Sequence, residues 1–162
     1  IISENNLIGS EGQGFSIAMH ALSGGRIGIA AQAVGLARTA LEKSVFYSKE
    51  RKQFGKSISE FGAIKEKIAD MATHLEAARL LVWKAAYLKD KGKKYDKESS
   101  MAKLFASKIA MDSAIDCVQI YGGYGYMQEY GIERLMRDAK ITEIYEGTSE
   151  IQRLVISREI MK

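Results

Sequence analysis

The chain has 162 residues, a length typical of one domain, and its 46% hydrophobic and 27% charged content is that of an ordinary globular protein. The net charge of +4 permits an anionic partner, but the basic residues are scattered apart from a run at residues 89–97, so we expect no nucleic-acid binding. Apolar runs are shorter than the ~20 residues that span a bilayer, so no membrane span is expected. His20 and His74 lack partners at metal-ligand spacing, so we expect no metal site.

Cysteine usage and helix-breaking residues set further limits. The single cysteine, Cys117, cannot form an internal disulfide, which favours a reducing compartment, and its apolar surroundings indicate a buried, unreactive thiol. Proline is absent, which favours long uninterrupted helices. The first eight residues are expected to be an extended segment that ends near Gly9.

The first long helix is predicted over residues 15–51, where apolar residues recur at helical spacing. The pair Gly24-Gly25 lies inside it and costs roughly 2 kcal/mol of helix propensity relative to two alanines. Either the helix bends at this pair or another part of the molecule approaches its backbone closely.

Two further long helices follow a turn at residues 54–57. The second helix is predicted over residues 59–89, with apolar residues in steps of three or four, and Trp83 is expected to be a packing residue rather than a platform for a ligand. The third is predicted over residues 96–120, ended by the glycines of residues 122–125. Its expected inward face consists of Met101, Leu104, Phe105, Met111, Ile115 and Val118.

A shorter helix is predicted near residues 132–139, and a last helix from about Ser149. Ser149 and Gln152 have the spacing of a capping box, which predicts that helix start. The fold class that follows is all-α, an antiparallel up-and-down helical bundle.

Two segments carry chemistry. The glycines of residues 122–125 do not complete a dinucleotide fingerprint, since Gln128 stands at the third glycine position and no strand precedes them, so they either cap a helix or let a ligand lie against bare backbone. Residues 144–150 lead into a helix N-terminus, which favours anions. Glu146 in this segment is either a general base that a bound ligand desolvates or an acidic residue that stabilises the helix dipole.

Several short motifs in consistent order resemble those of the acyl-CoA dehydrogenases, over nearly the whole chain and closest to the short- and medium-chain types. The motifs lie at residues 6–9 (NLIG), 11–15 (EGQGF), 25–30 (GRIGIA), 51–55 (RKQFG), 119–126 (QIYGGYGY), 136–140 (MRDAK) and 144–148 (IYEGT). The resemblance implies that an acyl-CoA thioester is oxidised to its trans-2-enoyl-CoA, with the β-hydrogen passing as hydride to FAD. It also implies an electron-transferring flavoprotein as electron acceptor.

Glu146 is the base that the resemblance implies. A few members of the family carry the base at the position matching Gly25, where a glycine cannot take a proton, so this chain follows the majority. The family stabilises the enolate-like oxygen with the backbone N–H of this glutamate and a ribityl hydroxyl of the flavin. An oligomerisation module without activity and an acyl-CoA oxidase-like domain remain alternatives.

The resemblance further assigns binding roles. The residues implied in FAD binding are Arg51, Gln53, Phe54, Gln119, Gly122, Gly123, Thr148 and Glu150. The first six would contact the flavin of a neighbouring subunit in a homodimer or homotetramer, and Thr148 and Glu150 that of their own. Arg26, Gly147 and Arg158 would contact substrate.

Enzymes of this family are more than twice as long, with two domains before this one. We therefore expect residues 1–14 to be a boundary segment from a missing β-domain and residues 15–162 to be the C-terminal helical bundle. The isolated piece is expected to be inactive. The resemblance places the parent protein in a bacterial cytoplasm or a mitochondrial matrix.

Overall fold

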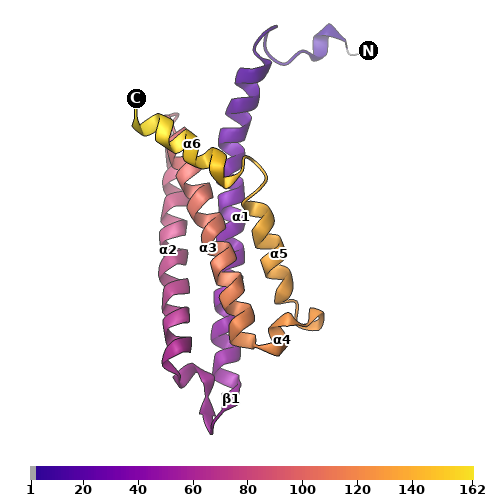
Figure 1. The fold of residues 1–162 in the computed structure, drawn as a ribbon. Helices are drawn as coiled ribbons and strands as arrows, with labels where there is room; N and C mark the ends of the chain where they lie inside the picture. The colour runs from indigo at the N-terminus through magenta and orange to yellow at the C-terminus, as the bar shows by residue number, and fades with distance from the viewer. Residues whose placement is uncertain (1–2) are drawn as a thin grey trace.

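Three long helices run alongside one another in the computed structural model, which describes residues 3–162. They are α1 (Gly14–Glu50), α2 (Gly62–Asp90) and α3 (Asp96–Tyr121), and they alternate in direction (Figure 1). The shorter α5 (Glu133–Thr142) packs against α1 and α3, and α6 (Ser149–Ile160) crosses the bundle at the end opposite the β1 hairpin. The predicted all-α antiparallel bundle is confirmed.

Short elements join the helices. The expected turn after α1 is a hairpin of β1 (Lys52–Gln53) and β2 (Lys56–Ser57), in which Lys52 pairs with Ser57 and Gln53 with Lys56. Its two turn residues, Phe54 and Gly55, both have positive φ, at 53° and 80°, as a type I′ turn requires. The remaining short elements are η2 (Ile58–Glu60), α4 (Gly123–Tyr126) and η3 (Gln128–Tyr130).

The N-terminal segment differs from the prediction. A 3₁₀ turn, η1 (Glu4–Asn6), replaces the extended segment that was expected over the first eight residues. The amide of Asn6 bonds the carbonyl of Ser3 and closes this turn locally. Ile1 and Ile2, which belong to the same prediction, lie outside the described residues.

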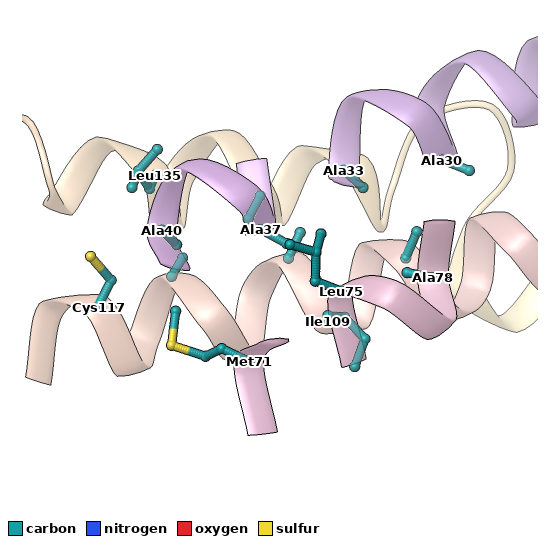
Figure 2. Close-up of a cluster of buried hydrophobic side chains, with 14 of the residues drawn as sticks. Ala30, Ala33, Ala37, Ala40, Met71, Leu75, Ala78, Ile109, Cys117 and Leu135 are labelled. Carbon is teal, nitrogen blue, oxygen red and sulfur yellow. The ribbon is translucent and has the colours of Figure 1, made fainter. Parts of the chain in front are cut away.

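The centre of the bundle is lined by small side chains. Figure 2 shows the alanines of α1 facing Met71, Leu75 and Ala78 of α2, with Ile109 and Cys117 of α3 close by. Alanine side chains let helix backbones approach closely, so the long helices pack along narrow seams. The buried alanines are Ala30, Ala33, Ala37 and Ala40 on α1, Ala78 and Ala85 on α2, and Ala102, Ala106, Ala110 and Ala114 on α3.

This packing corrects the predicted inward face of α3. Met101 and Ile115 are 37% and 45% exposed, whereas Ala106 and Ala110 beside them are almost fully buried. The sequence pattern favours large apolar residues, but most of the buried positions of α3 are alanine or serine. Trp83, which was expected to be a packing residue, is 59% exposed on α2.

The single cysteine of the chain lies in α3. Cys117 is fully buried, as predicted, and burial raises the pKa of its thiol. Within residues 3–162, none of the helices is long and apolar enough to cross a membrane, and no cluster of potential metal ligands occurs.

Candidate active site at the loop between α5 and α6

The loop between α5 and α6 has an unusual backbone. Glu146 has φ of 54° and Gly147 has φ of 93°, so both residues lie in the left-handed region. A non-glycine residue is uncommon there and persists only when surrounding contacts hold it, at a cost of about 1–3 kcal/mol. Glu146 therefore sits in a conformation that the rest of the structure must impose.

Helix α1 meets this loop at Gly25. A Cβ atom built on Gly25 would lie 2.5 Å from Oε2 of Glu146, closer than any real contact, so only a glycine admits the carboxylate at this place. Helix α1 continues through Gly24 and Gly25 without a break. Of the two predicted explanations for the glycine pair, close approach of another segment is therefore the correct one for Gly25.

Arg26 adds positive charge beside the carboxylate. Its guanidinium is buried, and Nη1 donates to Oγ of Ser100 at 3.4 Å, while Nε has no hydrogen-bond partner in the described part of the chain. Burial lowers the pKa of Arg26, while Asp96 and Glu146 act in the opposite direction and Arg158 lowers it further. Glu146 and Arg158 thus both lie within electrostatic reach of Arg26; the resemblance assigned these three residues to the base and to substrate binding.

Lys103 and Gln152 hold the loop by hydrogen bonds to its backbone carbonyls. The sequence analysis assigned neither residue a role at the site. Lys103 Nζ donates to the carbonyl oxygen of Gly147 at 2.7 Å, and Gln152 Nε2 donates to the same oxygen at 2.9 Å and to that of Glu146 at 3.3 Å. Both side chains are fully buried. Lys103 could have been found from its position, since it lies on the buried small-residue face of α3 between Ser99 and Ser107.

Burial lowers the pKa of Lys103 to about 8. The carboxylates of Glu143, Glu150 and Glu146 act to raise this pKa, and Arg26 lowers it further. A lysine ammonium in a dry interior loses its hydration, so its charged form is disfavoured. The charge of Lys103 is therefore retained only in part at mildly alkaline pH.

The start of α6 differs from the predicted capping box. The helix begins at Ser149 as predicted, but the residue before it, Thr148, occupies the cap position, and its side chain accepts no capping bond. Gln152 reaches back to the loop carbonyls instead of the cap amide. Glu150 is exposed in the first turn, where its own backbone N–H and the Thr148 hydroxyl lower the pKa of its carboxyl.

A second group of the predicted residues surrounds a cavity at the other end of the bundle. Arg51, Gln53, Gly122 and Gly123 line a cavity of about 470 Å³ together with Tyr47, Ile58, Ile120, Tyr121, Tyr124 and Met127. Phe54 is 92% exposed at the tip of the hairpin, and Gln119 is exposed on α3; neither lines the cavity.

Aromatic rings and one cation shape this cavity. Tyr47 and Tyr121 stack with ring centroids 4.0 Å apart, and the guanidinium of Arg51 lies 5.7 Å from the ring centre of Tyr124. Gly122 has φ of 61° and, like Gly123, leaves its backbone without a covering side chain. Bare backbone, stackable rings and an arginine fork fit a ligand with phosphate and aromatic parts.

The two groups of residues lie far apart. Arg26 lies inside α1 and Arg51 directly follows its last residue, so the two are about 38 Å apart along the helix axis at 1.5 Å per residue. The loop before α6 and the hairpin beside α4 accordingly lie at opposite ends of the bundle (Figure 1). One chain therefore does not bring all the predicted residues into one site.

Comparison with known proteins agrees with this fold and these motifs. Residues 12–161 match the family model described as "Acyl-CoA dehydrogenase, C-terminal domain". The chain therefore belongs to the acyl-CoA dehydrogenase family and corresponds to its C-terminal domain, which confirms the resemblance noted in the sequence.

Similar proteins of known name give the context. The chain is 59% identical over 160 residues to an acyl-CoA dehydrogenase of Bacillus subtilis, covering 99% of this chain and 42% of that protein. It is 51% identical over 161 residues to subunit CarC of the caffeyl-CoA reductase-Etf complex of Acetobacterium woodii, covering 99% of this chain and 42% of CarC. The structure of butyryl-CoA dehydrogenase from Megasphaera elsdenii superimposes with a TM-score of 0.98 at 51% identity, over 99% of this chain and 42% of that one. The chain thus spans less than half of the relatives it matches.

Proposed function

We propose that this chain is the C-terminal domain of a longer FAD-dependent acyl-CoA dehydrogenase, with Glu146 as the base that removes the α-proton of the acyl-CoA. The contact between Glu146 and Gly25 carries this proposal. A carboxylate on a strained loop, admitted by a missing side chain on the facing helix, is held in one place although it forms no ion pair within residues 3–162. Such fixed positioning is what a general base needs and what a carboxylate that merely stabilises a helix dipole does not.

The neighbouring residues fit the reaction. As the α-proton moves to Glu146, negative charge develops on the thioester carbonyl, where the backbone N–H of Glu146 would donate to it. The guanidinium of Arg26, with its unpaired Nε, and that of Arg158 supply positive charge on the same side for the acyl-CoA. Gly147, directly after the base, has φ of 93°, so glycine suits the backbone that would lie next to the thioester. A bound FAD would supply the hydride acceptor for the β-hydrogen, which the oxidation to a trans-2-enoyl-CoA requires.

The cavity beside the hairpin supports FAD as the cofactor. Arg51 offers a planar fork for pyrophosphate oxygens, Gln53 lies next to it, and Gly122 and Gly123 offer bare backbone for the adenosine part. Phe54 and Gln119 would complete this contact from the rim. At the other end, Thr148 and Glu150 lie beside the Glu146 loop, where they would meet a flavin ring.

The separation of about 38 Å between the two groups favours a homo-oligomer. Arg51 and its neighbours would contact the FAD of an adjacent subunit, while Thr148 and Glu150 contact the FAD next to their own Glu146. Large apolar side chains exposed along the helices, such as Phe46, Trp83 and Tyr87, are available for subunit contacts. A dimer or tetramer follows, in which assembly and catalysis belong to the same domain.

We further infer that an electron-transferring flavoprotein exchanges electrons with the flavin. CarC, a relative at 51% identity, is named as a subunit of a complex with Etf. The same relative is named a reductase, so the reverse reaction, reduction of a 2-enoyl-CoA with Glu146 as proton donor to Cα, is the second candidate.

The experiment is the substitution Glu146→Gln in the full-length protein, assayed with short acyl-CoA substrates and an artificial electron acceptor. The carboxamide keeps the shape of the side chain but cannot take a proton, so kcat should fall by about 10²–10⁴-fold while FAD stays bound. Glu133→Gln is the matched control, because it removes a half-buried carboxylate at the far end of α5 that pairs with Arg137. Near-normal kcat in Glu146→Gln would show that the base lies elsewhere.

A further inference from the structure

Lys103 is the one lysine that the structure describes as fully buried, and its burial needs a reason. Removing an ammonium from water costs several kcal/mol, and an apolar side chain of similar length usually fills such a position with equal or better stability. Helix α3 uses alanine, serine and isoleucine elsewhere on the same buried face. A role in packing therefore does not explain a lysine at position 103.

The head group of Lys103 is directed to one place. Nζ donates to the carbonyl oxygen of Gly147 at 2.7 Å. Gly147 directly follows Glu146, the residue that carries the carboxylate. A hydrogen bond from a charged donor is roughly twice as strong as a neutral one, so this contact fixes the peptide plane that follows Gly147.

Gln152 completes the contact from α6. Its Nε2 donates to the carbonyls of Glu146 and Gly147, at 3.3 Å and 2.9 Å. It also lies 2.7 Å from the position of a Cβ on Gly147, so it closes the space beneath that residue. Two buried side chains from two different helices thus hold consecutive carbonyl groups of a loop that has φ of 54° and 93°. The third constraint is the Gly25 backbone, against which the carboxylate rests.

We propose that Lys103 and Gln152 are positioning residues for the catalytic base: together they hold the Glu146 and Gly147 carbonyls, keep the loop in its left-handed conformation, and so fix the Glu146 carboxylate against Gly25. The inference rests on the proposed role of Glu146. In this inference a buried lysine of α3, outside the loop itself, controls the position of the carboxylate that takes the proton.

The contact has a built-in pH dependence. The charged groups that face Lys103 are Glu143 at the end of α5, Glu146 on the loop, Glu150 on α6 and Arg26 on α1. The pKa of Lys103, lowered to about 8 by burial, means that the ammonium becomes a neutral amine as the pH rises through that value. The neutral amine still donates to Gly147 but more weakly, so the loop is held less firmly at alkaline pH.

The test uses the full-length FAD-loaded protein with two variants and one control. Lys103→Met removes the charge and the donor but keeps an unbranched side chain of similar length, and Gln152→Met removes the two contacts that Gln152 makes with the loop carbonyls. Lys67→Met is the matched control, because Lys67 is a partly buried lysine that bridges α2 and α3 through Asp116, away from the Glu146 loop. The measurements are kcat and KM between pH 6 and pH 10, FAD content, and hydrogen exchange of the amides of residues 144–149.

Lys103→Met should lower kcat by about 10- to 100-fold, the size of effect that a misplacement near 1 Å produces, with FAD content unchanged and faster exchange in the loop. The wild type should lose activity as the pH rises through about 8, and this transition should be missing in Lys103→Met but present in Gln152→Met and in Lys67→Met. Gln152→Met should also lower kcat, so it tests the proposal by itself where Lys103→Met does not fold.

Unchanged kcat, pH profile and loop exchange in Lys103→Met overturn the positioning role, as does a Gln152→Met variant with wild-type kcat. A variant that is only less stable, with normal turnover once folded, overturns it too, since that is what a purely structural lysine would give. If Glu146→Gln keeps its turnover, the proposed base and the positioning role fail together; if Glu146→Gln is inactive and Lys103→Met is normal, only the positioning role fails.

Discussion

Replacing Gly25 by alanine should separate the stability of the domain from its activity. The new Cβ would lie 2.5 Å from Glu146 Oε2 and 2.9 Å from Cδ of the same carboxylate, whereas an ordinary contact is about 3.5 Å. The carboxylate must therefore move by about 1 Å. Because it is the end of a flexible side chain, it can move without unfolding the helix that displaces it.

The substitution should change the free energy of unfolding little and the activity strongly. Alanine in a helix interior is favoured over glycine by about 1 kcal/mol, and an off-rotamer glutamate costs about 0.5–1.5 kcal/mol, so Gly25→Ala should change the free energy of unfolding by less than about 1 kcal/mol. A misplacement of about 1 Å at a reacting group can lower kcat by about 10²-fold. Gly28→Ala is the control one turn further along α1, where a Cβ meets nothing within 4 Å.

The assay is urea unfolding of the 162-residue chain, followed by circular dichroism, together with steady-state kinetics of the full-length variants. Gly28→Ala should gain about 1 kcal/mol and keep its kcat. Gly25→Ala should have near-wild-type stability and a kcat lower by at least about 10-fold. A Gly25→Ala variant with normal kcat would refute the idea that this glycine admits the base, and a loss of several kcal/mol would show that the contact is not confined to a flexible side chain.

Two more predictions concern the cofactor and the fragment. Arg51→Ala in the full-length protein should lower both FAD retention and oligomer stability, because a ligand held between subunits stabilises the assembly by about 2.7 kcal/mol at 100 times its Kd. Size-exclusion chromatography with a flavin-to-protein absorbance ratio measures both quantities, with Lys52→Ala as the neighbouring control. A variant that keeps full flavin and full oligomer at micromolar dilution would contradict the cross-subunit role of Arg51. The 162-residue chain alone should fold into a helical bundle yet reduce no artificial acceptor when given FAD and butyryl-CoA, because the domains that complete the site are missing; measurable turnover would show that the site is more complete than we propose.

The sequence by itself determined the helices and the family. Steps of three and four between apolar residues, the absence of proline and the glycines after α3 located the three long helices to within a few residues of their ends. The motifs from residue 6 to residue 148 identified the acyl-CoA dehydrogenase family, which the family model over residues 12–161 confirms. The roles assigned to Glu146, Arg51 and the other site residues stay predictions.

Local patterns were misleading where several helices compete for the same space. Met101 and Ile115 belong to the apolar repeat of α3 and still face outward, because most of the positions where α3 packs against its neighbours are taken by alanine and serine. Ser149 and Gln152 have the spacing of a capping box, but Gln152 bonds the loop carbonyls because Glu146 and Gly147 are folded over it. In both cases a contact between distant segments outweighs a local preference.

What only the tertiary structure decided is how the base is held. Gly25, Lys103 and Gln152 come from three different helices, and no spacing in the sequence relates them to one another. The sequence allowed Gly24-Gly25 to be either a bend or a place of close approach; packing α1 against the α5–α6 loop put the carboxylate on Gly25. A local pattern reports the periodicity of one helix, whereas the left-handed loop of Glu146 depends on contacts across the bundle, which exist only once the helices have packed.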